Sequence, residues 1–168
     1  FEFLEMGQDY RGISADFVRI INKKLGINMK PVPGLSWSEV MAKAKAGEID
    51  VLPCVVQTPE RLKYLNFTTF YVEKPLVILS EENSPLYDGI ADIQGPIAVV
   101  SGYFYEELLK RDYPDKKYLF VDTVDEAIKA VTSGEAYAFL GNLASVSYAL
   151  RRLGIMNVRV SGHTEYTY

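Results

Sequence analysis

Patterns typical of helices and of strands alternate along the whole chain, and this alternation limits the fold more than any single motif does. The first predicted helix begins at Ser14, a residue that can cap a helix, and ends at Gly26. Apolar residues recur on one of its faces at helical spacing: Phe17, Ile20, Ile21 and Leu25. Strands are predicted at residues 28–33, where prolines interrupt the pattern, and at residues 49–56, 97–100, 136–140 and 158–160, and residues 67–80 form a long apolar extended segment. Helices that alternate with strands in this way predict an α/β fold.

Two segments of the chain begin and end a helix in the same way. Ser36-Trp-Ser-Glu39 and Thr123-Val-Asp-Glu126 are both capping boxes, whose outer side chains satisfy backbone N–H groups at a helix start. In each segment a glycine, Gly47 or Gly134, follows the glutamate by eight positions and ends the predicted helix. One interpretation is a pair of similar α/β lobes with a ligand cleft between them. The other is coincidence among common helix signals.

Three further features complete the predicted organisation. Residues 103–111 and 142–153 are predicted helices, and Thr58-Pro59 is a cap followed by proline at the first helical position. Residues 81–88 are polar and rich in turn formers, which makes them a candidate domain boundary. The chain opens on Phe1 rather than Met, so we interpret it as a fragment whose signal peptide or membrane span lies outside it.

The composition argues against several classes of function. Lys and Arg number 18 against 22 Asp and Glu, a net charge of −4 without a basic run, so nucleic-acid binding is not expected. A single cysteine, Cys54, allows neither an internal disulfide nor a cysteine zinc site. The sequence has no GxGxxG, Walker or HExxH motif, and His163 is its only histidine. Neither a metal or cofactor site nor histidine-based catalysis is therefore expected.

Arg61 is the first candidate binding residue. It follows the predicted strand at residues 49–56 and lies in the first turn of a short helix, and strand ends of α/β sheets line ligand crevices. A guanidinium there can grip a carboxylate with two parallel hydrogen bonds. The alternative is a surface arginine that pairs with Glu60 or another nearby acid.

Trp37 and Cys54 each have a structural and a functional interpretation. Trp37 is the only tryptophan and begins a predicted helix, where an indole can either fill the core or stack on a ligand. Cys54 is expected to be a small buried apolar residue rather than a nucleophile, because no histidine is next to it in sequence to lower its pKa.

Two strand-to-helix turns in the second half are further candidates. Gly102-Tyr103-Phe104 precedes a predicted helix, whose amino end offers N–H groups to an anion, although a simple tight turn explains it equally well. Asn142 stands at the equivalent turn of the next segment, where its simplest role is to cap a helix.

Several motifs together carry a resemblance to a known family. They are Tyr10-Arg-Gly-Ile-Ser-Ala-Asp16, Trp37, Gly47-Glu-Ile-Asp-Val51, Thr58-Pro-Glu-Arg61 and Asn66-Phe-Thr-Thr-Phe-Tyr71. In order and spacing the chain resembles the family 3 extracellular solute-binding proteins, the periplasmic amino-acid-binding type, also called Venus flytrap domains. The resemblance covers essentially the whole chain.

The resemblance implies a type II clamshell of two α/β lobes joined by two hinge strands. Residues 1–80 would be the first lobe with the first hinge strand, and residues 81–160 the second lobe. Residues 161–168 would cross back to the first lobe. That lobe would be truncated at both chain ends, lacking a strand before Phe1 and a returning segment after Tyr168.

The resemblance also implies a set of ligand-binding residues: Arg61, Trp37, Cys54, Val56, Gly102, Tyr103, Phe104 and Asn142. Arg61 corresponds to the arginine that holds the ligand's α-carboxylate, and Trp37 to the aromatic residue that packs on the ligand. The turn from Gly102 to Phe104 corresponds to the second-lobe turn whose backbone meets the same carboxylate.

Two of these positions depart from the family's pattern. Asn142 stands where the family has an aspartate that receives the ligand's α-ammonium, and Val56 offers no hydroxyl. Losing the charge-assisted part of that hydrogen bond costs on the order of 1 kcal/mol or more. A carboxylate ligand without a free amine therefore fits better than a standard amino acid.

A narrower resemblance suggests the biological role. Gly102-Tyr103 together with Gly141-Asn142-Leu-Ala-Ser145 resembles the flytrap sensor domains of membrane histidine kinases of the virulence-sensor type. It implies a periplasmic sensor for a small ligand at the inner membrane, in a membrane-anchored parent, with no particular oligomeric state favoured. The alternatives are a binding protein of an ABC importer and, less expected, an enzyme similar to cyclohexadienyl dehydratases.

Overall fold

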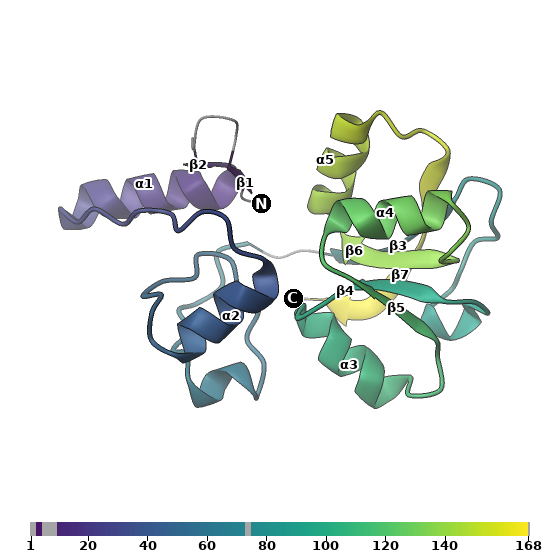
Figure 1. The fold of residues 1–168 in the computed structure, drawn as a ribbon, viewed down its shortest axis with the longest axis horizontal. Helices are drawn as coiled ribbons and strands as arrows, with labels where there is room; N and C mark the ends of the chain where they lie inside the picture. Colours follow the sequence, from purple (N-terminus) through teal and green to yellow (C-terminus); the bar gives the residue numbers. More distant parts are fainter. Residues whose placement is uncertain (1–2, 5–9, 73–74, 168) are drawn as a thin grey trace. The chain divides into compact units, whose positions relative to one another are not determined.

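The computed structural model describes residues 3–4, 10–72 and 75–167 (Figure 1). By its internal contacts the chain divides into two compact units, Phe1–Phe67 and Thr68–Tyr168. The helices and strands confirm the α/β character expected from the sequence. The lobe limits at residues 80 and 160 remain predictions, and the outermost ones, Phe1 and Tyr168, lie outside the described residues.

The first unit is helical over most of its regular structure. Its elements are β1 (Phe3–Leu4), β2 (Tyr10–Arg11), α1 (Ile13–Leu25), α2 (Trp37–Lys45) and the 3₁₀ helix η1 (Arg61–Lys63). The strands β1 and β2 pair antiparallel.

The N-cap of helix α1 lies two residues earlier than the sequence indicates. Its N-cap is Gly12, with a φ of 111°, whose carbonyl accepts the Asp16 N–H at 3.1 Å. Ser14, the expected cap, lies inside the helix and is fully buried. The expected end is confirmed, since Gly26 adopts the left-handed conformation at φ 65° that favours glycine.

Helix α2 has the capping box that its sequence predicts. The Ser36 side chain accepts the Glu39 N–H at 3.3 Å, and the Glu39 carboxylate accepts the Ser36 N–H at 2.7 Å. These hydrogen bonds from Ser36 hold the pKa of Glu39 below its usual value. The box fixes Trp37 as the first residue of the helix.

The strands expected at residues 28–33 and 49–56 were wrong. In the part of the chain that the structure describes, neither segment forms a strand or pairs in any sheet. A strand exists only where a neighbour completes its hydrogen bonds, and apolar patterning cannot supply one. Pro31 and Pro33 also lack the N–H that a ladder needs.

The second unit contains a five-stranded sheet. Its elements are β3 (Pro75–Glu81), η2 (Ile90–Asp92), β4 (Ile97–Val100), α3 (Phe104–Asp112), β5 (Tyr118–Val121), α4 (Val124–Thr132), β6 (Ala138–Asn142), α5 (Leu143–Leu153) and β7 (Val158–Thr167). The strand order is β5-β4-β6-β3-β7. Strand β4 is parallel to both neighbours, while β3 is antiparallel to β6 and β7.

The helices of the second unit cover both faces of this sheet. The chain moves outward from β4 to β5 and then back past β4 to β6, and right-handed crossovers in opposite directions place α3 and α4 on opposite faces. Figure 1 shows this arrangement, with α4 and α5 on one side of the strands and α3 on the other. The core between α4 and the sheet includes Ile128, Val131 and Phe139, all with no exposed surface.

Candidate functional site

Arg61 is held in the first unit by its own loop. It is the first residue of η1 and only 4% of its surface is exposed. Its guanidinium Nη1 donates to the Val56 carbonyl at 2.9 Å, and its backbone N–H donates to the Thr58 hydroxyl at 3.3 Å. The surface position that the alternative interpretation required was wrong, because Arg61 is buried.

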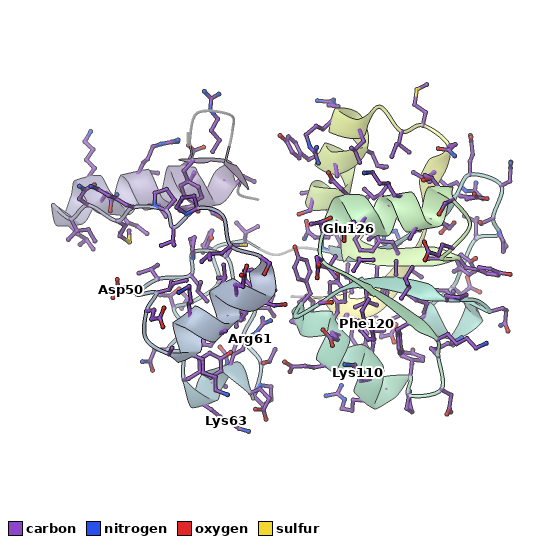
Figure 2. The ribbon with its side chains drawn as sticks, viewed as in Figure 1. Asp50, Arg61, Lys63, Lys110, Phe120 and Glu126 are labelled. Atoms are coloured by element: carbon purple, nitrogen blue, oxygen red, sulfur yellow. The ribbon has the colours of Figure 1, made fainter. Side chains whose placement is uncertain are left out.

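Trp37 lies close to the same guanidinium. The Arg61 Cζ is 6.0 Å from the centre of the Trp37 ring, within the range of a cation–π contact. Figure 2 shows Arg61 beside α2, the helix that Trp37 begins. The structure thus brings Arg61, Trp37 and the Val56 backbone together, and half-buried Cys54 precedes Val56 in the same segment.

This arrangement suits the recognition of a carboxylate. A guanidinium presents its N–H donors in a planar fork, a shape that can bind a carboxylate with two parallel hydrogen bonds, and Nη1 of this fork donates to the Val56 carbonyl. The indole and the partly buried surroundings reduce competition from water. Thr58, whose hydroxyl holds the Arg61 backbone, was missed as a positioning residue, although its cap position in the sequence signals it.

In the second unit, the remaining candidates come together at one edge of the sheet. Strands β4 and β6 are adjacent and parallel, so their carboxyl ends meet there. The chain leaves β4 into α3 and β6 into α5, on opposite faces of the sheet (Figure 1). Such a topological switch point is where open α/β sheets bind ligands. The turn at Gly102 and the side chain of Asn142 both belong to it.

The turn from Gly102 to Phe104 is less open to an anion than the sequence suggests. Gly102, at φ 74°, donates its N–H to Glu106 Oε2 at 2.7 Å, and the Tyr103 N–H donates to the Val100 carbonyl at 3.3 Å. Glu106 also pairs with Lys110 at 2.6 Å. A ligand anion at this turn would share it with the Glu106 carboxylate, a residue that the sequence analysis missed.

Asn142 caps helix α5, as its simplest interpretation predicts. Its Oδ1 accepts the N–H groups of Ala144 and Ser145 at 3.0 and 3.2 Å. The side-chain amide is therefore held in one orientation at the end of β6. A role in ligand binding is compatible with this capping and stays a prediction.

A polar cluster lies at the other end of α3. Asp112 accepts two hydrogen bonds from Arg111 and one from the Tyr166 hydroxyl, which lower its pKa to about 2. The Tyr113 hydroxyl donates to Glu165, which raises the pKa of Tyr113 to about 12. These bonds tie the end of β7 to the end of α3.

The first unit also contains a cavity of about 350 Å³. It is lined by residues 29–32 and 48–53 with Tyr10, Val18 and Val40, and none of the predicted site residues lines it. Across the described part of the chain, no group of three or more His, Cys, Asp or Glu side chains is placed to hold a metal. No helix there is both long and apolar enough to cross a membrane.

Known proteins resemble this chain in sequence and in fold. It is 25% identical to the virulence sensor protein BvgS of Bordetella pertussis over 162 residues, 96% of this chain and 13% of BvgS. The crystal structure of the periplasmic VFT2 domain of BvgS matches with a TM-score of 0.84 at 23% identity, covering 98% of this chain and 71% of that domain. This chain therefore spans only a small part of its curated relative.

Two further matches are a second sensor domain and a binding protein of a transporter. The crystal structure of a histidine kinase sensor domain with similarity to periplasmic binding proteins matches with a TM-score of 0.90 at 20% identity, covering 99% of this chain and 73% of that one. The ABC transporter arginine-binding protein 1 of Escherichia coli is 27% identical over 108 residues, 62% of this chain and 44% of that protein.

A family model also matches the chain. The model for bacterial extracellular solute-binding proteins, family 3, matches residues 1–142. The expected resemblance to this family and to virulence-sensor domains is confirmed, and so is the Venus flytrap fold class. The chain belongs to the bacterial extracellular solute-binding proteins, family 3.

Proposed function

We propose that the chain is the small-solute-binding sensor domain of a membrane histidine kinase, on the periplasmic face of the inner membrane. The match to BvgS carries this proposal, because 96% of the chain aligns with a 13% portion of a much longer sensor protein. That is the relation of an input domain to its receptor. The domain itself binds and does not catalyse.

The proposed ligand carries a carboxylate, which Arg61 binds while Trp37 covers the ligand's body. Cys54 and Val56 line the same side, and Gly102, Tyr103, Phe104 and Asn142 meet the ligand from the second lobe. The lobes, at residues 1–80 and 81–160, close on it through the crossings that include residues 161–168. Ligand binding would then shift an open–closed equilibrium that the parent protein transmits.

A thermal-shift screen tests this function. Its compounds are amino acids, amine-free carboxylates and aromatic acids, each measured with the wild type, Arg61→Ala and Lys63→Ala. Removing a desolvated guanidinium partner costs about 2 to 5 kcal/mol of binding free energy, so the stabilisation should vanish in Arg61→Ala. Lys63, an exposed residue of the same 3₁₀ helix, is the matched control and should leave it unchanged. Stabilisation that survives in Arg61→Ala would contradict the proposal.

The match to the arginine-binding protein of Escherichia coli favours a second candidate, a solute-binding protein of an ABC importer. The full reading frame separates the two. A membrane span followed by a kinase domain supports the sensor, and a stop codon soon after Tyr168 supports the importer.

A further inference from the structure

We propose that two hydrogen bonds between α3 and β7, Tyr113–Glu165 and Tyr166–Asp112, form a latch that limits how far the two lobes move relative to each other. This inference rests on the proposed function in one respect, because it takes β7 as the strand that crosses back to the first lobe. None of the four latch residues belongs to the proposed ligand site.

The pairing of β7 with β3 is irregular where the latch lies. Pro75 pairs with Thr167 and Val77 with His163, so two steps along β3 match four steps along β7. Pro75 also has no N–H to donate to a ladder. Residues 164–166 therefore form a bulge, and the regular hydrogen bonds that would fix this part of β7 are interrupted there.

The bulge lies at the end of the sheet where β3 begins and β7 ends. Pro75 is the first residue of β3, and its partner Thr167 is the last residue of β7. Leu76, the next residue of β3, pairs with Asn142 at the end of β6, and its carbonyl accepts the Thr164 hydroxyl at 3.1 Å. The shape of the bulge thus sets the direction in which β7 leaves the sheet.

Side chains supply the restraint that the interrupted ladder does not. The Tyr113 hydroxyl donates to Glu165 Oε1 at 2.5 Å, and the Tyr166 hydroxyl donates to Asp112 Oδ2 at 2.7 Å. The helix thus contributes one donor and one acceptor, and so does the bulge. Hydrogen bonds to carboxylates are stronger than those between neutral groups. Two such bonds on consecutive residues hold the bulge in one conformation.

Helix α3 is anchored to the sheet independently of the latch. Leu109 is only 1% exposed, and the Tyr118 hydroxyl of β5 donates to the Leu109 and Tyr113 carbonyls at 3.1 and 2.7 Å. The latch therefore ties the bulge to a fixed helix, and breaking it should release β7 rather than α3. Tyr118 is the matched control, because its hydroxyl binds the same helix end without bonding to β7.

Substitutions that keep the aromatic rings isolate the latch. Tyr113→Phe and Tyr166→Phe each remove one hydroxyl and one latch bond, the double variant removes both, and Tyr118→Phe is the control. Glu165→Gln keeps an oxygen that accepts the Tyr113 hydroxyl, whereas Glu165→Ala does not. Circular dichroism and melting temperatures verify that each variant folds.

Two measurements on the ligand-free chain test the latch. Amide hydrogen exchange at residues 163–167 should be several-fold faster in the double variant, with β4 unchanged. Time-resolved energy transfer from Trp37, the only tryptophan, to a dye on Lys129→Cys, an exposed position of α4, reports the spread of distances between the units. Every chain in this measurement carries Cys54→Ser, so that only residue 129 is labelled. The spread should be broader in the double variant and unchanged in Tyr118→Phe.

Faster exchange together with a broader distance distribution, absent in Glu165→Gln and present in Glu165→Ala, supports the latch. Unchanged exchange in the double variant overturns it. Faster exchange with an unchanged distance distribution also overturns it, because the bonds would then stabilise β7 without restraining the lobes. Neither measurement uses a ligand, so a carboxylate screen in which Arg61→Ala behaves as the wild type would reject the proposed ligand site and leave the result for the latch standing.

Discussion

Helices α2 and α4, one in each unit, are both capped by a hydroxyl side chain and both precede a glycine, yet the segments that follow them differ. Each helix has nine residues, and the glycines beyond them, Gly47 and Gly134, both adopt a φ of 75°. After α4 the chain enters β6 and pairs with strands on both sides. After α2 it enters residues 49–56, which form no strand within the described residues. Helix signals act locally, whereas a strand depends on neighbours elsewhere in the chain.

The two units also differ in how far they bury their apolar residues. On α4, Ile128 and Val131 have no exposed surface. On α1, Ile20 is 51% exposed and Leu25 is 68% exposed, although both lie on the apolar face that the sequence predicts. The second unit therefore has a core of its own, and the first unit leaves the apolar face of α1 largely uncovered in this chain.

One substitution in each unit tests this contrast, and it should give the largest change in the free energy of unfolding. Ile128→Ala should lower the free energy of unfolding by about 2 to 5 kcal/mol, because it leaves a cavity beneath α4. Ile20→Ala, the matched change on α1, should alter it by no more than about 0.5 kcal/mol. Chemical denaturation followed by circular dichroism measures both. Equal losses would mean that Ile20 is as deeply packed in solution as Ile128.

Removing the helix cap should cause a smaller loss of stability, and the loss should be the same in both units. Ser36→Ala and Thr123→Ala each remove a side-chain acceptor from the first turn of a helix, at a cost of about 1 kcal/mol. Amide hydrogen exchange should report faster exchange in the first turns of α2 and α4 respectively. A cap that matters in only one unit would break the local equivalence of the two helices.

Much of the fold could be predicted because its signals are local. The caps at Ser36 and Thr123, the stop at Gly26 and the strand at residues 97–100 all appear where the sequence indicates them. The second predicted capping box is only half formed, because the Glu126 carboxylate accepts the Asp122 N–H instead of the Thr123 N–H. The start of α1 was misplaced because Gly12 reaches a φ of 111° and caps the helix with its backbone alone. Residues 49–56 carry a strand-like pattern but find no partner strand among the described residues, and patterning cannot supply a partner.

The candidate site was predictable only in part for the same reason. Arg61 and Trp37 stand at helix starts that local signals mark, but their contact brings together residues 24 positions apart. The hydrogen bond from Gly102 to Glu106 depends on the side-chain conformation of Glu106. A pattern of residue types does not determine that conformation.

The smallest expected effect is on the pH dependence of folding stability, and it arises from the polar cluster around Asp112 in the second unit. Asp112 has a usual pKa of 3.8 that Arg111 and Tyr166 lower to about 2 in the folded protein. Its contribution to stability is therefore present above about pH 4 and is lost as the pH falls through about 2. Urea denaturation across this range should show a shallower acid decline for Asp112→Asn than for the wild type. Superimposable pH profiles would show that the cluster does not stabilise the fold.

The contact between Arg61 and Trp37 permits the most direct test of the central claim, that a carboxylate binds in the first unit beside these two residues. Trp37 is the only tryptophan, so tryptophan emission reports on this position alone. A carboxylate that stabilises the protein should change the Trp37 emission in a saturable way, with the same Kd that calorimetry gives, and should do neither in Arg61→Ala. A ligand that binds tightly by calorimetry without any change in Trp37 emission would place the site elsewhere and contradict the claim.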